Sequence, residues 1–304
     1  MKMLFKMGIR NVFRNKKRST LTAIAVGVGL SSFLLMDGIY EGMFDSMIRN
    51  VTTSLTSQAQ VHSEKFRESQ EPEYVIKNLP DVESLLKSNK DVVGYAKRVL
   101  SFAMIASPRN TRNIQLYGVQ AEEEKKVNLV YKYMKEGDFD LKKGEIILGQ
   151  KLFEDLELRM GERVVLTTSQ VKSGEISQEL FKVVGRISFG SDALDKAIAF
   201  TSLKSAQSML AIGSDVHEIA LKLTNKELAL DENLDLWDEI RGSQNIALGW
   251  NKLAPGIESM VEMGQVNAAA AGLGNTRFLA ADLTLPPPNH LKKAKITKAL
   301  LDPP

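Results

Sequence analysis

Apolar positions are concentrated in one long run near the N-terminus of this chain. Residues 19–36 contain no charged side chain, and an apolar stripe with helical spacing continues from there to residue 49. About 20 apolar residues are enough to cross the hydrocarbon core of a bilayer. The pattern therefore predicts one membrane helix near residues 19–40, within a longer helix over 19–49.

The segment that precedes this run, residues 1–18, is basic and amphipathic. Its apolar side chains fall on one side of a helical wheel and its cations on the other, which suits a helix lying on an anionic membrane surface. Basic residues before the run and acidic residues after it favour a cytoplasmic N-terminus. We therefore expect a single pass through the inner membrane, with residues from 50 onward outside the cytoplasm. The cations expected to contact the membrane surface and set this topology are Lys6, Arg10, Arg14, Lys16, Lys17 and Arg18.

Two other interpretations of the run remain, a buried helix of a soluble domain and a cleaved signal peptide. A signal peptide needs small residues at a cleavage site after its apolar core. Here the core continues into "DGIYEGMFDSM", which has no such site. The sequence favours an anchor that is not cleaved.

Between residues 50 and 249 the pattern alternates between the periods of strands and helices. Residues 145–169 predict a helix that ends near Gly161 and is followed by a strand. The mixture of hairpin and crossover spacings indicates an α+β fold. The other predicted helices are 79–89, 203–210 and 230–242, and the other predicted strands are 59–63, 92–107, 112–119, 179–189, 196–202, 217–224 and 245–250.

The chain changes character after residue 249. Residues 250–263 predict a helix that leads back toward the membrane. Residues 264–304 are rich in Ala and then in Pro, and their pattern is compositional rather than periodic. We expect this atypical tail to be disordered or only marginally helical.

Charge and cysteine content narrow the function. Residues 1–18 carry seven cations and no acid, and residues 291–304 carry four lysines and one acid, so the net charge of +3 leaves −7 for the rest. Basic charge confined to the ends gives no reason to expect a nucleic-acid partner. The chain has no cysteine, and His62, His217 and His290 are far apart in sequence, which leaves little for a metal site.

The sequence predicts no catalytic, cofactor or metal site. It contains no G-x-x-x-x-G-K-[ST] phosphate loop, no G-x-S-x-G elbow and no H-E-x-x-H pair. The acids 122–124 precede two lysines, and we interpret them as a solvated helix face. Asp192 and Asp195 are interpreted as turn residues, and His217 as a surface or edge residue. We predict a protein that is not an enzyme and has no cofactor.

Several segments, in order, resemble the FtsX-like ABC transporter permeases, the group that contains the lipoprotein-releasing LolC and LolE proteins and MacB. The likeness covers roughly residues 1–263 and is specific as an ordered set rather than piece by piece. Its segments are "MGIRNVFRNKKRSTLTAIAVGVGL", "MDGIYEGMFDSMIRNV", "QAQVH", "IQLYGVQAEEEKKVNLVYKYMKEGDF", "GEIILGQKLFEDLELRMGERVVL", "FKVVGRISFG", "AFTSLKSAQSML" and "WNKLAPGIESMVEM".

The resemblance implies an architecture and a set of partners. Family members carry a mixed α/β periplasmic domain of the MacB-like core type between the first and second of four membrane helices. The expected partners are a separate ATPase subunit, a second permease subunit in a homo- or heterodimer, membrane lipid, and a lipoprotein or periplasmic carrier. A stripe facing the substrate or a partner, with dimer packing alone as the alternative, is expected at Leu34, Leu35, Ile39, Met43 and Met47.

The chain departs from the family after Met263, where three further membrane helices are expected and the atypical tail stands instead. We therefore expect a truncated or frameshifted permease. Two functions stay open. The first is a permease subunit for lipoprotein release, export or mechanotransmission, driven by a separate ATPase. The second is a single-span, membrane-anchored periplasmic adaptor without transport activity.

Overall fold

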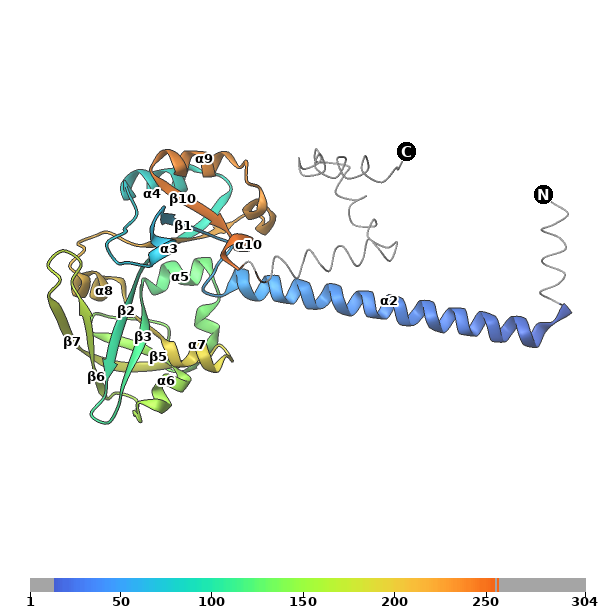
Figure 1. The fold of residues 1–304 in the computed structure, drawn as a ribbon, viewed down its shortest axis with the longest axis horizontal. Helices are drawn as coiled ribbons and strands as arrows, with labels where there is room; N and C mark the ends of the chain where they lie inside the picture. Colours follow the sequence, from blue (N-terminus) through green and yellow to red (C-terminus); the bar gives the residue numbers. More distant parts are fainter. Residues whose placement is uncertain (1–13, 255, 257–304) are drawn as a thin grey trace, which may run out of the picture. The chain divides into compact units, whose positions relative to one another are not determined.

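The computed structural model describes residues 14–254 and residue 256 (Figure 1). The chain divides into two compact units, residues 1–46 with 258–304, and residues 47–257. We treat each unit by itself. The predictions for residues 1–13, for most of 250–263 and for the tail 264–304 lie outside the described residues.

From Lys16 on, the described residues of the first unit belong to helix α2 (Lys16–Thr53), whose last residues belong to the second unit. This helix begins three residues before the predicted segment 19–49 and ends four residues after it. At 1.5 Å per residue its 38 residues extend roughly 57 Å, whereas a bilayer core is about 30 Å thick. Among the described residues, α2 is the one helix long and apolar enough to cross a membrane, and none of its apolar window is buried.

The second unit is an α+β domain, as predicted. Its described strands are β1 (Ala59–Ser63), β2 (Val92–Ala106), β3 (Thr111–Val119), β4 (Met134–Glu136), β5 (Glu145–Gly149), β6 (Arg163–Ser169), β7 (Ile176–Ile187), β8 (Ile198–Ser202), β9 (Glu218–Leu223) and β10 (Asn245–Gly249). Its helices are α3 (Phe66–Ser69), α4 (Leu79–Ser88), α5 (Ala121–Val127), α6 (Gln150–Asp155), α7 (Asp192–Ala197), α8 (Leu203–Leu210), α9 (Asp235–Gly242) and α10 (Trp250–Leu253), with 3-10 turns η1 (Val130–Tyr133) and η2 (Lys226–Leu230).

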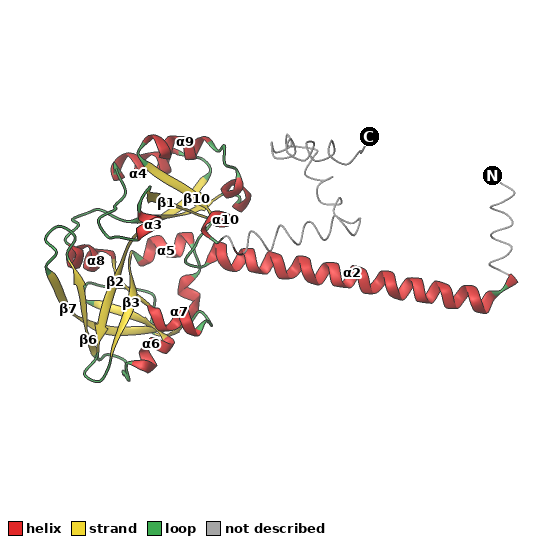
Figure 2. Ribbon diagram, in the orientation of Figure 1, coloured by secondary structure: helices red, strands yellow, loops and turns green. Residues whose placement is uncertain are grey.

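The long strand β2 belongs to two parts of the domain at once. Its first half pairs with β9 in the sheet β10–β1–β9–β2, which packs against α4 and α9 (Figure 2). Its second half pairs with β3 on one side and with β6 on the other. The strands β2, β3, β8, β5, β7 and β6 therefore close into a ring. The domain is a small sheet and a six-stranded barrel that share one strand.

Alternation along β2 separates the inside of this barrel from its outside. Ala103 and Ile105 are buried in the barrel core, whereas Phe102 and Met104 between them are exposed. This is the period of two that a strand with one solvated face requires. Helix α8 packs on both parts, because Leu210 belongs to the core of the sheet and Met209 to that of the barrel.

Residues 145–149 form a strand, so the predicted helix over 145–161 is wrong at its start. Strand β5 lies parallel to β7 and antiparallel to β8, and four of its five residues are buried. A continuous apolar run does not separate a strand covered on both faces from a buried helix. The helical pattern that follows is the short α6.

Two further segments differ from their predictions. Helix α9 begins at Asp235, five residues later than the predicted start of 230–242, because η2 and a turn occupy the preceding residues. Asp192 and Asp195 lie in helix α7 rather than in a turn. Asp195 is buried there and accepts hydrogen bonds from Ser188 Oγ at 2.7 Å and from the backbone N–H of Phe189 at 2.8 Å.

The close approach between the end of β5 and α7 yields a testable prediction. A methyl group at Gly149 would overlap the backbone carbonyl of Asp195, which cannot withdraw as a flexible side chain can. We expect Gly149→Ala to lower the free energy of unfolding by about 1–3 kcal/mol. Denaturant unfolding followed by the fluorescence of Trp237 and Trp250, both in this domain, measures it.

The matched control is Gly242→Ala at the end of α9, where nothing lies within 4 Å of an added methyl group. Alanine also has the higher helix propensity. We expect this control to be neutral or slightly stabilising. Equal unfolding midpoints for the two variants would contradict the close approach at Gly149.

Candidate functional site

A buried polar cluster lies where the small sheet and the barrel meet. Arg98 on β2 is paired with Val119 of β3 on one side and with Glu218 of β9 on the other. Beyond it, the β9 side of β2 has no strand neighbour until β6 pairs at Met104. The sheet therefore opens around Leu100, and a pocket of about 160 Å³ lies there.

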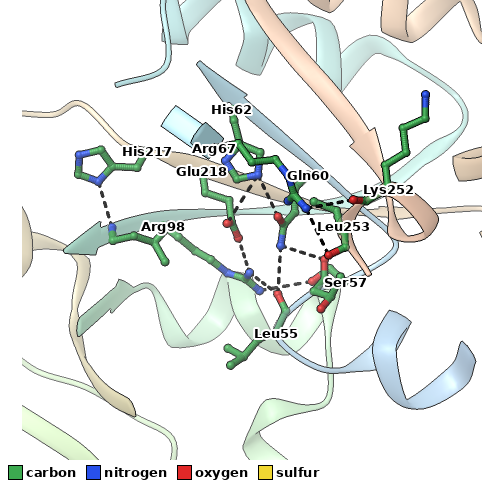
Figure 3. A network of polar contacts seen from close by, with 12 residues as sticks. Leu55, Ser57, Gln60, His62, Arg67, Arg98, His217, Glu218, Lys252 and Leu253 are labelled. Carbon is green, nitrogen blue, oxygen red and sulfur yellow. Dashed lines mark hydrogen bonds and ion pairs between the residues drawn. The ribbon is translucent and has the colours of Figure 1, made fainter. Parts of the chain in front are cut away.

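Arg98 is fully buried, and every nitrogen of its guanidinium group has a hydrogen-bond acceptor. Figure 3 labels three of these partners, Leu55, Ser57 and Glu218. Its Nε and Nη2 donate to the two carboxylate oxygens of Glu124, at 2.5 and 3.0 Å. Its Nη1 donates to Glu218 Oε1 at 2.5 Å and to the backbone carbonyl of Leu55 at 2.6 Å. Its Nη2 also donates to Ser57 Oγ at 3.3 Å. These contacts use all five N–H donors of an arginine.

The electrostatics of the cluster follow from its burial. Burial opposes the charge on Arg98, but attraction to Glu124 and Glu218 outweighs it and holds the arginine pKa above its ordinary value. Burial raises the pKa of Glu218, although Arg98 partly opposes this. Removing one partner from a buried ion pair costs about 3–5 kcal/mol, because a charge is left uncompensated.

Beside the cluster, the ring of Phe66 is stacked between two imidazoles. Its centroid lies 5.8 Å from that of His62 and 5.1 Å from that of His217, with interplanar angles of 15° and 12°. The open edge of β2 fixes the tautomer of His217, because its Nδ1 accepts the backbone N–H of Leu100 at 3.0 Å. The Nε2–H of His217 then donates to the carbonyl of Pro72 at 2.8 Å.

His62 is held as a neutral donor. Gln60 Nε2 donates to the carbonyls of Leu55 and Thr56, which leaves Gln60 Oε1 to accept from His62 Nε2 at 2.9 Å. Burial lowers the pKa of His62 to about 3, and the nearby cations Arg67 and Arg98 add to this effect. Burial also lowers the pKa of His217. Both imidazoles are therefore neutral at neutral pH.

The cluster is suited to holding the chain rather than to binding a ligand through its charges. The N–H donors of Arg98 all bind carboxylates or residues just after the end of α2. Arg67, at the rim of the pocket, donates to the carbonyls of Lys252 and Leu253, near the last described residues. Within the described part of the chain, no three His, Cys, Asp or Glu side chains group as metal ligands would.

The predicted apolar stripe belongs to α2. Within one continuous helix, a spacing of four residues places Leu35, Ile39, Met43 and Met47 on one face. Leu34 is turned from Leu35 by about 100° and leaves that line. Leu34, Leu35, Ile39 and Met43 are 55%, 68%, 66% and 46% exposed, and Met47 is half-buried.

Among the predicted topology cations, the structure describes Arg14, Lys16, Lys17 and Arg18, and all four are exposed. Lys6 and Arg10 lie outside the described residues.

Two interpretations from the sequence are wrong at this cluster. Glu124 is not part of a solvated helix face, because it is 2% exposed and bound to Arg98. His217 is not a surface residue, because it is fully buried beside the central strand β9. A signal was present in β2, where Ala96, Arg98 and Leu100 share one side of the strand. A cation at an inward position requires a buried carboxylate partner.

The lowered pKa of His62 predicts how stability responds to acid. Above pH 6.5, His62 is neutral in both the folded and the unfolded chain. As the pH falls from 6.5 toward 3, His62 takes up a proton in the unfolded chain but stays neutral in the folded one. The stability contributed by neutral His62 is lost over that window, at about 1.4 kcal/mol per pH unit. We expect His62→Gln to abolish this loss, so that between pH 7 and 5 the parent loses about 2 kcal/mol more than the variant.

Denaturant unfolding at a series of pH values measures the difference between the two profiles. The raised pKa of Glu218 acts in the opposite direction, with stability lost as pH rises through its folded value, so the difference matters rather than the parent profile alone. His217→Gln removes the second buried imidazole and is expected to change the profile in the same direction. Parallel profiles for parent and His62→Gln would show that His62 titrates normally in the folded state.

Comparison with known proteins places this geometry in a family. The model of the MacB-like periplasmic core domain matches residues 19–231. The lipoprotein-releasing system transmembrane protein LolC of Neisseria meningitidis serogroup B is 26% identical over 240 residues, which is 73% of this chain and 55% of LolC. The chain thus spans about half the length of that curated relative.

Two more likenesses are of narrower meaning. The periplasmic region of MacB from Actinobacillus actinomycetemcomitans superposes with a TM-score of 0.47 at 14% identity, covering 69% of this chain and 95% of that structure. A stretch of 47 residues, 16% of this chain, is 55% identical to 11% of the 23S rRNA (uracil(1939)-C(5))-methyltransferase RlmD of Marinomonas sp.. That second likeness concerns a short stretch only.

The family match is the decisive one, because it extends from the predicted membrane segment to the turn before α9. It contains Arg98, Glu124 and Glu218, together with the strands that carry two of them. The resemblance seen in the sequence is confirmed: the chain belongs to the family of the MacB-like periplasmic core domain.

Proposed function

We propose that this chain is a permease-type subunit of an ABC transporter complex, anchored in the inner membrane by α2, with its domain in the periplasm. A separate ATPase subunit supplies the energy, and a second permease subunit completes the dimer. The observation that carries the proposal is the continuity of α2, a helix long enough to span a bilayer whose last turns pack in the core of a MacB-like domain.

The end of α2 supports an anchor that is retained. Ile48 and Val51 pack against the core of the small sheet, and Thr52 is buried. A segment removed by a signal peptidase does not contribute its own end to the core of the mature domain. The cations at residues 14–18 support a cytoplasmic start, since positive charge marks the cytoplasmic side.

We propose that the substrate is an apolar or lipid-bearing molecule, and that the transporter releases lipoproteins. The name of LolC, the lipoprotein-releasing relative, supports this substrate. The apolar side chains Leu35, Ile39, Met43 and Met47, at a spacing of four, offer such a molecule or a partner helix one continuous stripe. Membrane lipid and a periplasmic carrier are the other partners we expect.

A single-span adaptor is the second candidate. It is favoured by one observation, that a single helix of the described residues is able to span a membrane. An adaptor would present the same domain to a periplasmic partner without moving a substrate past the stripe. The two candidates therefore differ in what contacts Ile39 and Met43.

The orientation is tested by cysteine labelling, because the chain has no cysteine of its own. Lys172→Cys lies in the exposed turn between β6 and β7, and Arg14→Cys lies before the apolar run. In intact cells with a permeabilised outer membrane, we expect an impermeant maleimide to label Lys172→Cys at least tenfold faster than Arg14→Cys. Lysis should equalise the two, and the reverse order would overturn the periplasmic placement.

The substrate is tested by photocrosslinking in the native host. A photoreactive residue at Ile39 or Met43 is expected to give lipoprotein adducts, several-fold above those from Leu34, which serves as the matched control on another helix face. Adducts with a protein partner alone would favour the adaptor. Equal lipoprotein adducts at all three positions would show that the stripe has no special role.

A further inference from the structure

The C-terminal end of α2 is only partly capped by the chain next to it, where the backbone N–H and the hydroxyl of Ser54 both donate to the carbonyl of Val51. The last carbonyls of a helix have no partner within it, and the helix dipole places partial negative charge there. A cation in the last turn often compensates this partial charge, but the last turn of α2 has no basic residue. Other elements of the domain supply hydrogen-bond donors instead.

Three carbonyls at and just after this end are bound by three different elements. The carbonyl of Thr53 accepts the backbone N–H of Leu129, after α5, at 2.8 Å. The carbonyl of Leu55 accepts from Arg98 on β2 at 2.6 Å and from Gln60 on β1 at 3.4 Å. Gln60 also donates to the carbonyl of Thr56 at 3.0 Å. The chain is thus held at each step as it leaves the helix.

The segment is held in a conformation that it would not keep alone. Ser57 has a φ of 58°, a left-handed conformation that is unfavourable for a residue with a side chain. It is fully buried, and its hydroxyl accepts from Arg98. The same guanidinium therefore binds residues on both sides of Thr56, where the chain turns into β1.

The side chain of Arg98 is itself fixed by contacts with two other elements of the domain. Glu124 binds two of its nitrogens from α5, and Glu218 binds a third from β9. Asn128 Nδ2 in turn donates to Glu124. A guanidinium held by two carboxylates from two elements gives the end of α2 a fixed partner.

We propose that Arg98 is a positioning residue that locks the end of α2 to the domain. A displacement of α2 then moves the small sheet and the barrel together, instead of being absorbed by a bend at residues 54–57. This proposal rests on the proposed function in one respect only, the purpose of the lock, which is to transfer motion between the membrane and the periplasm. Its geometry is independent of any substrate or ATPase.

A role in stability alone is the alternative, and a charge-free variant separates the two. Arg98→Met by itself leaves two buried carboxylates without a cation and is expected to unfold the domain. The triple variant Arg98→Met/Glu124→Met/Glu218→Met removes the charges while it keeps similar side-chain volumes. Replacing a whole buried ion-pair cluster by apolar residues of similar volume is often close to neutral for stability. The donor to Leu55 and Ser57 is nevertheless gone.

The experiment measures the distance between spin labels in the full chain in lipid nanodiscs. Labels are placed at Asn50→Cys, in the last turns of α2, and at Thr224→Cys, after β9, both of which are exposed. We expect one narrow distribution in the parent and a distribution at least twice as wide in the triple variant, with an unchanged denaturation midpoint. An unchanged width in a folded triple variant overturns the proposal.

Two further variants keep the test decisive. Arg98→Lys keeps the charge, and with it the fold, but an ammonium group cannot reach both carboxylates and the carbonyl of Leu55 together. We expect it to widen the distribution even where the triple variant does not fold, and an unchanged width would overturn the lock. The matched control is Glu83→Gln/Lys97→Met, which removes the neighbouring 2.9 Å ion pair between α4 and β2 and should leave the width unchanged.

The measurement needs neither ATP nor a lipoprotein, so its failure is distinct from a failure of the proposed function. A wide distribution in the parent would also overturn the lock, whatever the crosslinking at Ile39 and Met43 shows.

Discussion

A guanidinium group enclosed by protein constrains every element that touches it. Because the pKa of Arg98 is raised further, the side chain remains charged, and a buried charge needs carboxylates and hydrogen-bond acceptors around it. Glu124 comes from α5, Glu218 from β9, and the carbonyl of Leu55 from the chain just after α2. Four segments distant in sequence must meet at one point, which fixes the placement of β9 and α5 beside β2 and of the incoming chain below them.

An apolar side chain at position 98 would fill the space but would not make these connections. Buried ion pairs are often no more stabilising than apolar replacements of similar volume. The guanidinium group also fixes the position of the segment after α2, because one planar group binds both the carbonyl of Leu55 and the hydroxyl of Ser57. A side chain also satisfies the open edge of β2 next to Arg98. There the N–H of Leu100, which no strand pairs, donates to His217.

The sequence was sufficient for features with a strong local pattern. The uncharged run of α2, the strand β1 and the helix α8 follow from hydropathy and periodicity alone. The strand Glu145–Gly149 could not be predicted in this way, because a strand covered on both faces shows no alternation of apolar and polar residues. Glu124 was misjudged for a different reason. It has acidic and basic neighbours that do face solvent, and only its partner, 26 residues earlier, shows that it is buried.

The pairing of the first and last strands of the domain gives the buried cluster its wider significance. Ala59 of β1 lies opposite Gly249 of β10, and the carbonyl of Gln58 accepts the N–H of Trp250 at 3.0 Å. The chain therefore enters and leaves the domain at neighbouring points, although about 190 residues separate them. Arg98 binds the incoming segment, and Arg67, from the rim of the same pocket, binds the carbonyls of Lys252 and Leu253 in the outgoing one. A domain held at one place through both of its connections can be moved as a body by whatever moves those connections. A permease and an adaptor would share this property, so the attachment of the domain at this cluster does not distinguish the two proposed functions.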